Sequence, residues 1–125
     1  MKAVIGDYLK KRIKPLLPSL KEKKQYLAFE VISDEKLTFN QIANSITYKS
    51  KEFLGNFGSA KAGIQILKET YNSKKQRGII RINNKWVHQL KSCFLFINKI
   101  DGKNAIIKSI GLSGVINKTK TLIAG

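Results

Sequence analysis

Few side chains in this 125-residue chain could carry out chemistry, and their spacing does not bring them together. His88 is the single histidine and Cys93 the single cysteine, which excludes histidine- or cysteine-rich metal sites and an internal disulfide. The two residues are five positions apart, so on a helix they would lie roughly 140° apart. No two acidic residues share a face of an expected strand, as a catalytic carboxylate pair would. The sequence therefore predicts neither an active site of protein side chains nor a metal or cofactor held by the protein.

Both of these residues have ordinary structural interpretations. Cys93 lies in the apolar run CFLFI, so we expect a buried thiol. His88 follows Trp86 at the start of an expected helix, and we expect it on the surface. We predict that Trp86 either packs over the start of this helix or anchors a protein partner, because aromatic side chains dominate the binding energy of interfaces.

The charge of the chain is its most informative property. There are 24 Lys and Arg residues against 8 Asp and Glu, which gives a net charge of +16. A domain this basic repels itself unless a polyanion compensates the charge. Nucleic acid is the first candidate and an anionic membrane surface the second, while a solvated surplus of lysine is the alternative without a binding role.

The cations fall into groups flanked by short polar side chains that can donate to phosphate oxygens. One group precedes the first expected strand, one forms a hairpin turn, and one follows the last strand. Two further cations lie on the strands themselves. The predicted RNA contacts are Lys21, Lys23, Lys24, Lys74, Lys75, Arg77, Arg81, Lys108, Lys118 and Lys120.

The elements that must position these cations follow from hydrophobic periodicity and turn signals. Alternation predicts strands, and apolar residues at helical spacing predict two helices that begin near Thr38 and near Asn83 or Asn84. Thr38 and Gln41 form a capping box, while Gly55 and Gly58 predict the end of the first helix. The expected strands are residues 25–32, 62–69, 78–83 and 104–116, with a turn at the Asp-Gly pair 101–102 and a bulge near Gly111 or Gly114.

The order strand, helix, strand, strand, helix, strand predicts an α+β fold of the ferredoxin-like or RRM-like type. In this fold two helices cover one face of a four-stranded antiparallel sheet, and we expect the other face to be uncovered. Arg81 and Ile79 alternate with Ile80 and Ile82, so they should project from that uncovered face. Ile79 and Arg81 stand where an RRM carries aromatic side chains that stack on bases, and Tyr26 is the one residue of the expected face that could still stack.

We divide the chain into a basic N-terminal extension (1–20), an RNA-binding domain (21–120) and a C-terminal tail (121–125). The extension is either a short helix ended by Pro15 and Pro18 or a solvated basic arm. Its apolar run, Ala3 to Ile5, is too short for the core of a signal peptide, and no stretch approaches the length of a membrane span. We therefore expect a cytoplasmic protein.

Four segments also resemble a known family in consistent order: residues 20–34 (LKEKKQYLAFEVISD), 52–72 (EFLGNFGSAKAGIQILKETYN), 77–83 (RGIIRIN) and 100–120 (IDGKNAIIKSIGLSGVINKTK). The resemblance is to ribonuclease P protein component 2, the archaeal counterpart of the eukaryotic Pop-five subunit. It extends from about Pro15 to Lys120, and the first fourteen residues do not match.

The resemblance implies an RRM-like subunit of the ribonucleoprotein that removes the 5′ leader from precursor tRNA. In that enzyme an RNA performs the chemistry with Mg²⁺, and the protein works beside a barrel-fold subunit of the Rpp-thirty type, in a heterodimer that pairs into a heterotetramer. The sheet face would then dock a protein partner or an RNA backbone instead of stacking bases. The expected partner contacts are Tyr26, Ile79 and Trp86.

Three other functions remain open at this stage. One is another ferredoxin-like RNA-binding accessory protein, such as a ribosomal or RNA-modification subunit. A second is an acylphosphatase-like enzyme, but the arginine it needs after the first strand is replaced by the sequence SDEK. The third is a basic protein of the membrane surface.

Overall fold

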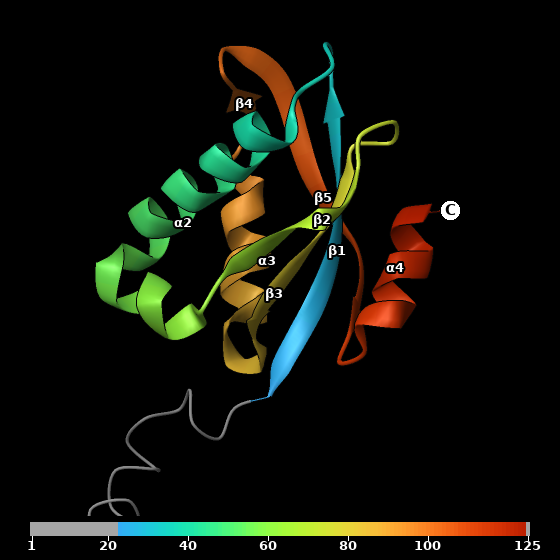
Figure 1. Ribbon diagram of the computed structural model, residues 1–125. Coiled ribbons are helices and arrows are strands. Elements are labelled where there is room, and N and C mark those ends of the chain that lie inside the picture. The colour runs from blue at the N-terminus through green and yellow to red at the C-terminus, as the bar shows by residue number, and fades with distance from the viewer. Residues whose placement is uncertain (1–22, 125) are drawn as a thin grey trace, which may run out of the picture.

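The computed structural model describes residues 23–124, which form a mixed α+β fold with one antiparallel sheet (Figure 1). The residues on either side of this range, including Lys21 and the predicted N-terminal extension, lie outside the described part. In chain order the elements are β1 (Lys24–Ser33), α2 (Phe39–Ala62), β2 (Gln65–Asn72), β3 (Arg77–Asn83), the 3₁₀ turn η2 (Asn84–Trp86), α3 (Val87–Leu95), β4 (Lys99–Ile100), β5 (Lys103–Ser113) and α4 (Ile116–Ala124).

The sheet has five strands in the order β2-β3-β1-β5-β4, whereas the sequence predicted four. The additional strand, β4, pairs only Lys99 with Asn104 and Ile100 with Lys103, so it is too short to show alternation. The predicted turn at Asp101 and Gly102 joins β4 to β5. Both turn residues have positive φ, 50° and 77°, as a two-residue hairpin turn of type I′ requires.

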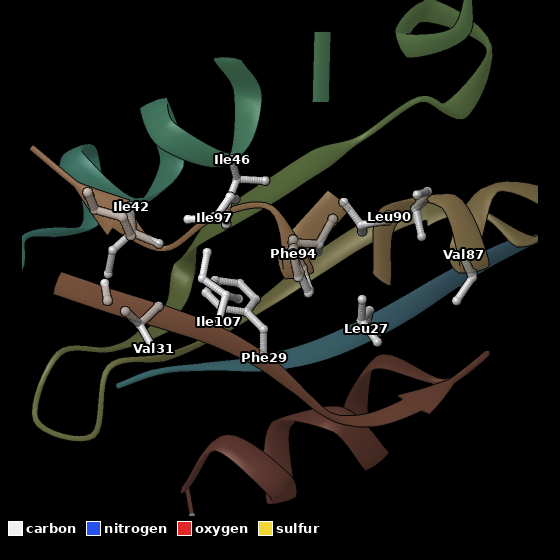
Figure 2. Packing of buried hydrophobic residues seen from close by; sticks show 14 of the residues in the cluster. Leu27, Phe29, Val31, Ile42, Ile46, Val87, Leu90, Phe94, Ile97 and Ile107 are labelled. Atoms are coloured by element: carbon white, nitrogen blue, oxygen red, sulfur yellow. The ribbon is translucent and has the colours of Figure 1, made fainter. Parts of the chain in front are cut away.

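The main core lies between one face of the sheet and the helices α2 and α3 (Figure 2). Leu27, Phe29 and Val31 of β1 point into it, as the alternation predicted, and Ile80 and Ile82 of β3 point the same way. The side chains between them on each strand point to the opposite face. The two sides of the sheet that were inferred from the sequence are therefore confirmed.

The longest helix, α2, begins as predicted but extends further. Thr38 accepts a hydrogen bond from the backbone N–H of Gln41, and the Gln41 side chain accepts one from the backbone N–H of Thr38, which completes the capping box. Gly55 has φ 76° and ψ 170°, which interrupts the helix with a kink and does not end it. The helix continues to Ala62 and ends at Gly63, whose φ of 61° is left-handed.

The largest departure from the sequence-based expectation is α4, which packs on the sheet face that we expected to be uncovered (Figure 1). The sequence predicted a last strand up to residue 116 and a tail at 121–125. Instead, β5 ends at Ser113 and α4 continues to Ala124. Ile123 of α4 is buried against Ala28 and Ile79, and forms a second, smaller core there.

A bulge in β5 lets the strand turn toward α4. The pairing of β1 with β5 shifts between Ala28, which faces Gly111, and Phe29, which faces Ser109, so Ile110 is the additional residue. A Cβ atom at Gly111 would lie 2.2 Å from the Cδ1 atom of Leu122 in α4. The predicted bulge near Gly111 is thus confirmed, and the glycine allows α4 to approach the strand closely.

Substitution of Gly78, the second residue of the RGIIRIN stretch, tests how tightly the main core is packed. A Cβ atom there would lie 2.8 Å from Cζ of Phe29 and 3.2 Å from Cδ1 of Tyr71. Since Phe29 is fully buried, its ring has no room to move, and we expect Gly78→Ala to lower the free energy of unfolding by about 1–3 kcal/mol. Urea unfolding measures this change. Gly114→Ala is the control, because its Cβ would meet no atom within 4 Å, and equal unfolding midpoints for both variants would contradict the packing described.

Candidate nucleic-acid interface

The β2–β3 turn and α4 bring together two groups of cations that are far apart in the sequence. The side chains of Asn72, Lys75 and Arg77 donate hydrogen bonds to the carbonyl oxygens of Ile123, Ala124 and Leu122, at 2.9, 3.3 and 3.2 Å. The last carbonyls of a helix have no partner within the helix, and cations near them interact favourably with its dipole. These contacts hold the end of α4 against the turn, so the predicted groups at residues 74–77 and 118–120 lie on two elements that are packed together.

Arg77 is the anchor of this arrangement. Its Nε donates a 2.7 Å hydrogen bond to Oε2 of Glu30 on the neighbouring strand, and both side chains are less than a quarter exposed. Lys108 lies on the other side of the same carboxylate, with Nζ 4.0 Å from Oε1. Two of the predicted RNA contacts are therefore neighbours of one acidic residue, and Arg77 joins β1, β3 and α4.

The exposed cations of this surface are Lys74, Lys75, Lys118 and Lys120. The Oδ1 atom of Asn72 accepts hydrogen bonds from the backbone N–H groups of Lys74 and Lys75, at 3.2 and 3.3 Å, and so fixes the turn. On α4, the exposed Lys118 and Lys120 lie roughly 100° to either side of buried Thr119. We call the surface formed by Lys74, Lys75, Lys118 and Lys120 the α4 surface.

The first predicted group lies at the other end of the sheet. Lys23 is exposed, and its carbonyl oxygen accepts a 2.9 Å hydrogen bond from the backbone N–H of Asn84. Lys24 is half-buried, with its ammonium group beside Gly63 at the end of α2. About seven residues of strand, roughly 23 Å, separate this end of β1 from the β2–β3 turn. Lys23 and Lys24 are therefore not part of the α4 surface.

Arg81 and its neighbours lie on the side of the sheet that the sequence predicted, but α4 covers part of that side. Ile79 is fully buried beneath α4, so its side chain is not exposed to a partner as we had expected. Tyr26 is half-buried against the same small core. Arg81 lies across from Tyr26 on β1 and from Gln65 on β2, and among residues 23–124 its buried Nε atom has no hydrogen-bond partner.

Trp86 packs inward from η2. Two atoms of its indole, Cη2 and Cζ3, lie 3.6 Å from the position that a Cβ of Gly58 would occupy, and the ring contacts the main core. Trp86 therefore has a packing role, against α2 and the main core. Because Trp86 is only partly buried, its role as a partner contact stays a prediction.

The structure shows aromatic residues on the surface of α2 although they follow the apolar helical spacing of the sequence. Phe53 and Phe57 continue the apolar spacing of α2, yet they are 46% and 75% exposed. The kink at Gly55 redirects the helix between them. Phe53 packs against Phe96 at a ring-centroid distance of 5.3 Å, and Phe96 is itself 59% exposed. Exposed apolar patches of this kind are typical of interaction surfaces.

His88 and Cys93 do not form a catalytic pair. Cys93 is buried, and its Sγ lies 4.0 Å from the Oγ of Ser50 in α2, whereas His88 is exposed on another side of α3. Burial raises the pKa of the Cys93 thiol, and the contact with Ser50 opposes this effect. Within residues 23–124 no group of three or more His, Cys, Asp and Glu side chains could hold a metal ion, and no helix is long and apolar enough to cross a membrane.

Because its pKa is raised, the Cys93 thiol stays protonated at neutral pH and is a poor nucleophile. We expect a thiol reagent such as iodoacetamide to label the native protein at pH 7 at least tenfold more slowly than the protein unfolded in urea. Mass spectrometry of the modified peptide measures both rates. Labelling at equal rates in the two states would show that Cys93 is accessible in the native fold.

The sequence of this basic α+β domain is similar to those of known proteins. Residues 25–124 match the model of the Rpp14/Pop5 family. Ribonuclease P protein component 2 of Pyrococcus abyssi is 34% identical over 109 residues, which cover 87% of this chain and 91% of the relative. The protein of the same name from Pyrococcus furiosus is 35% identical over 112 residues, covering 90% and 92%. The one from Methanosarcina mazei is 31% identical over 106 residues, covering 85% and 88%.

A chain in the cryo-EM structure of yeast ribonuclease MRP has a similar fold, with a TM-score of 0.58 at 13% sequence identity. The similarity covers 82% of this chain and 87% of that chain. The structural similarity defines the class of fold, a small mixed α+β domain. The family match is specific: the chain belongs to the Rpp14/Pop5 family.

Proposed function

We propose that this chain is a protein subunit of ribonuclease P, the ribonucleoprotein that removes the 5′ leader from precursor tRNA by endonucleolytic cleavage. The observation that supports this proposal most strongly is the family match over residues 25–124, together with relatives named ribonuclease P protein component 2 over most of both chains. In this role the subunit has an RRM-like, ferredoxin-like domain that binds the catalytic RNA and stabilises its active shape.

The distribution of charge supports a role in binding RNA instead of cleaving it. The exposed lysines of the α4 surface are suited to neutralise phosphates, which allows RNA helices to approach one another. The residues that could have served as nucleophile or base, Cys93 and His88, lie on different sides of α3: Cys93 is buried beside Ser50, and His88 is exposed. We propose that the RNA performs the cleavage and that the Mg²⁺ ions required for it are bound to the RNA.

The proposed protein partner is a barrel-fold ribonuclease P subunit of the Rpp-thirty type, and the proposed assembly is a heterotetramer in which two copies of this chain pair. Tyr26 and Trp86 are the expected partner contacts that remain partly exposed. We place the assembled particle in the cytoplasm, where precursor tRNA of an archaeal cell is processed. Co-purification of the two proteins, followed by light scattering of the complex, tests the partner and the stoichiometry.

Binding of the isolated chain to ribonuclease P RNA tests the proposed function. We expect log K to fall linearly with log salt concentration, with a slope of roughly −0.7 to −0.9 for each phosphate neutralised. Filter binding or fluorescence anisotropy from 50 to 500 mM KCl measures the slope. A ribosomal RNA fragment of equal length is the comparison, because preferred binding to it would favour another RNA-binding accessory function. The absence of any binding to ribonuclease P RNA at 50 mM KCl would contradict the proposal.

A further inference from the structure

A groove between α3 and β5 is separate from the α4 surface and has a different chemistry. It has a volume of about 400 Å³ and lies on the side of the sheet covered by α2 and α3. The helix contributes His88, Lys91, Ser92 and Leu95, which recur at the i, i+3, i+4 and i+7 positions of one helix face. The opposite face of α3 fills the main core. These four residues therefore line the groove as one continuous stripe.

The other wall of the groove is an edge of the sheet that has no neighbouring strand. The pairing of β5 with β4 ends at Asn104, so on this side residues 105–113 have no strand partner within the described part of the chain (Figure 1). Unpaired backbone groups at a strand edge are ready to pair with another molecule. The edge therefore presents a row of donors and acceptors along the groove.

The direction of these backbone groups follows from two hydrogen bonds at the start of β5. The carbonyl oxygen of Asn104 accepts from the N–H of Asp34, so Asn104 turns toward β1. The N–H of Ala105 donates to the carbonyl of Asn98, so Ala105 turns away from β1. Since the backbone groups of successive residues in an antiparallel strand point to opposite edges, those of Ile107 and Ser109 point out to the groove. Both residues line it.

The lining of the groove is basic and partly apolar. His88 and Lys91 border it together with the hydroxyls of Ser92 and Ser109, and no acidic side chain lines it. Leu95 is 82% exposed and contributes an apolar side chain to the same lining. A ligand that matches this lining has negative charge, a planar apolar face, and an edge of hydrogen-bonding groups that can pair with a protein backbone.

We propose that the groove between α3 and the free edge of β5 binds one or two unpaired nucleotides of a single-stranded RNA segment. The Watson–Crick edge of a base pairs with the backbone of Ile107 and Ser109, its face lies on Leu95, and its phosphate lies near His88 and Lys91. Only unpaired bases present that edge, and a site of this volume is of the size that holds small ligands, not a duplex. The proposal rests on the proposed RNA-binding function and adds a site that recognises bases.

Charge also distinguishes this occupant from a second copy of the chain. Pairing two β5 edges across a twofold axis would bring the Lys91 ammonium groups of both copies toward each other. Like charges held together in this way oppose association. A polyanion instead gains from the same positive groups, so charge complementarity favours RNA.

The test compares binding of the full chain to one fluorescein-labelled 12-nucleotide RNA, single-stranded or annealed to its complement. The double variant His88→Gln/Lys91→Gln replaces the imidazole and the ammonium group of α3 by neutral amides, and Lys51→Gln, an exposed change on α2, is the control for the lost lysine charge. We expect the double variant to weaken binding of the single strand at least fivefold and of the duplex less than twofold. Lys51→Gln should change both affinities by less than twofold.

A second pair of variants tests the backbone contact directly. Ser109→Pro removes an N–H that points to the groove, a position at which an edge strand tolerates proline, and Ser109→Ala keeps that N–H. We expect Ser109→Pro to bind the single strand at least fivefold more weakly than Ser109→Ala does, because only the proline lacks the backbone N–H. Thermal melting verifies that Ser109→Pro is folded. If it is not, the single-strand and duplex affinities of the His88→Gln/Lys91→Gln variant decide the question.

Three results would overturn the proposal. In the first, the groove variants bind the single strand as tightly as the unchanged protein does, and in the second they lose single-strand and duplex affinity equally. In the third, they keep RNA binding and lose the barrel-fold subunit, which would identify the occupant as a protein strand. In each case binding of the unchanged chain to ribonuclease P RNA still supports the proposed function, whereas a chain that binds no RNA contradicts both.

Discussion

Replacing Ile123 with aspartate is expected to lower the free energy of unfolding by about 3 kcal/mol, because an unpaired charge would enter the small core beneath α4. Ile123 is 5% exposed and contacts Ala28 and Ile79. For a domain of this size the change corresponds to a fall of roughly 12–24 °C in the melting midpoint, which calorimetry measures. Since α4 carries Lys118 and Lys120, its displacement should also weaken RNA binding.

Thr121→Asp is the matched control for this prediction. Thr121 is exposed on the same helix, so the substitution adds the same charge near the same helix end without entering the core. We expect its midpoint to change by less than a third of the change in Ile123→Asp. Similar midpoints for the two variants would show that α4 does not pack on the sheet in solution.

The triple change Lys74→Gln, Lys118→Gln and Lys120→Gln is expected to have the largest effect on RNA affinity. It removes three of the four exposed lysines of the α4 surface and keeps Lys75, whose ammonium group donates to the carbonyl of Ala124. Because each of these lysines is expected to neutralise about one phosphate, the log–log salt slope should become less steep by about 2, and the affinity at 50 mM KCl should fall roughly 10- to 100-fold. Anisotropy titrations with ribonuclease P RNA measure both quantities.

A second triple variant with the same net charge separates position from overall charge. Lys51, Lys68 and Lys99 are exposed on α2, β2 and β4, and none belongs to α4 or the β2–β3 turn. We expect their replacement by glutamine to change the salt slope by less than half as much. Equal effects of the two triple variants would show that RNA responds to the net charge of the chain and not to the α4 surface.

Substitution of Arg77 should have a different effect from substitution of these lysines. Because it bridges Glu30 and the end of α4, its loss should appear first in stability and then in RNA affinity. The sequence could not distinguish Arg77 from Lys74, since both belong to one polar turn. The distinction depends on Glu30, which lies 47 residues away in the sequence.

The parts of the fold that depend on local signals were predictable. The alternation of Leu27, Phe29 and Val31 identified the inner face of β1, and the Thr38–Gln41 capping box identified the start of α2. The Asp-Gly pair identified the β4–β5 turn. In each case the determinant lies within a few residues of the structure it specifies.

The helix α4 was missed because a threonine occupies one of its buried positions. Ile116, Thr119 and Ile123 recur at the spacing of a helix, but only two of them are apolar, and lysines surround them. Thr119 is fully buried and satisfies its hydroxyl by a 2.7 Å hydrogen bond to the carbonyl of Ile116. The signal for this helix would have been the i, i+3, i+7 spacing of Ile116, Thr119 and Ile123, with the threonine counted as a buried residue.

The aromatic residues of α2 and the α3–β5 groove depend on geometry that a single sequence does not display. The kink at Gly55 decides that Phe57 is exposed, although its spacing continues the apolar stripe. The free edge of β5 depends on how few residues β4 contributes to the sheet. His88 was expected on the surface and is there, but its neighbours across the groove become apparent only from the strand order.

The most direct test of the account is reconstitution of precursor-tRNA cleavage from ribonuclease P RNA and the barrel-fold subunit, with and without this chain, at limiting Mg²⁺ concentration. We expect the chain to increase the rate of cleavage at the mature 5′ end at least tenfold, and to cleave nothing when the RNA is omitted. An unchanged rate, or cleavage by the protein alone, would contradict the conclusion that this basic domain assists an RNA catalyst.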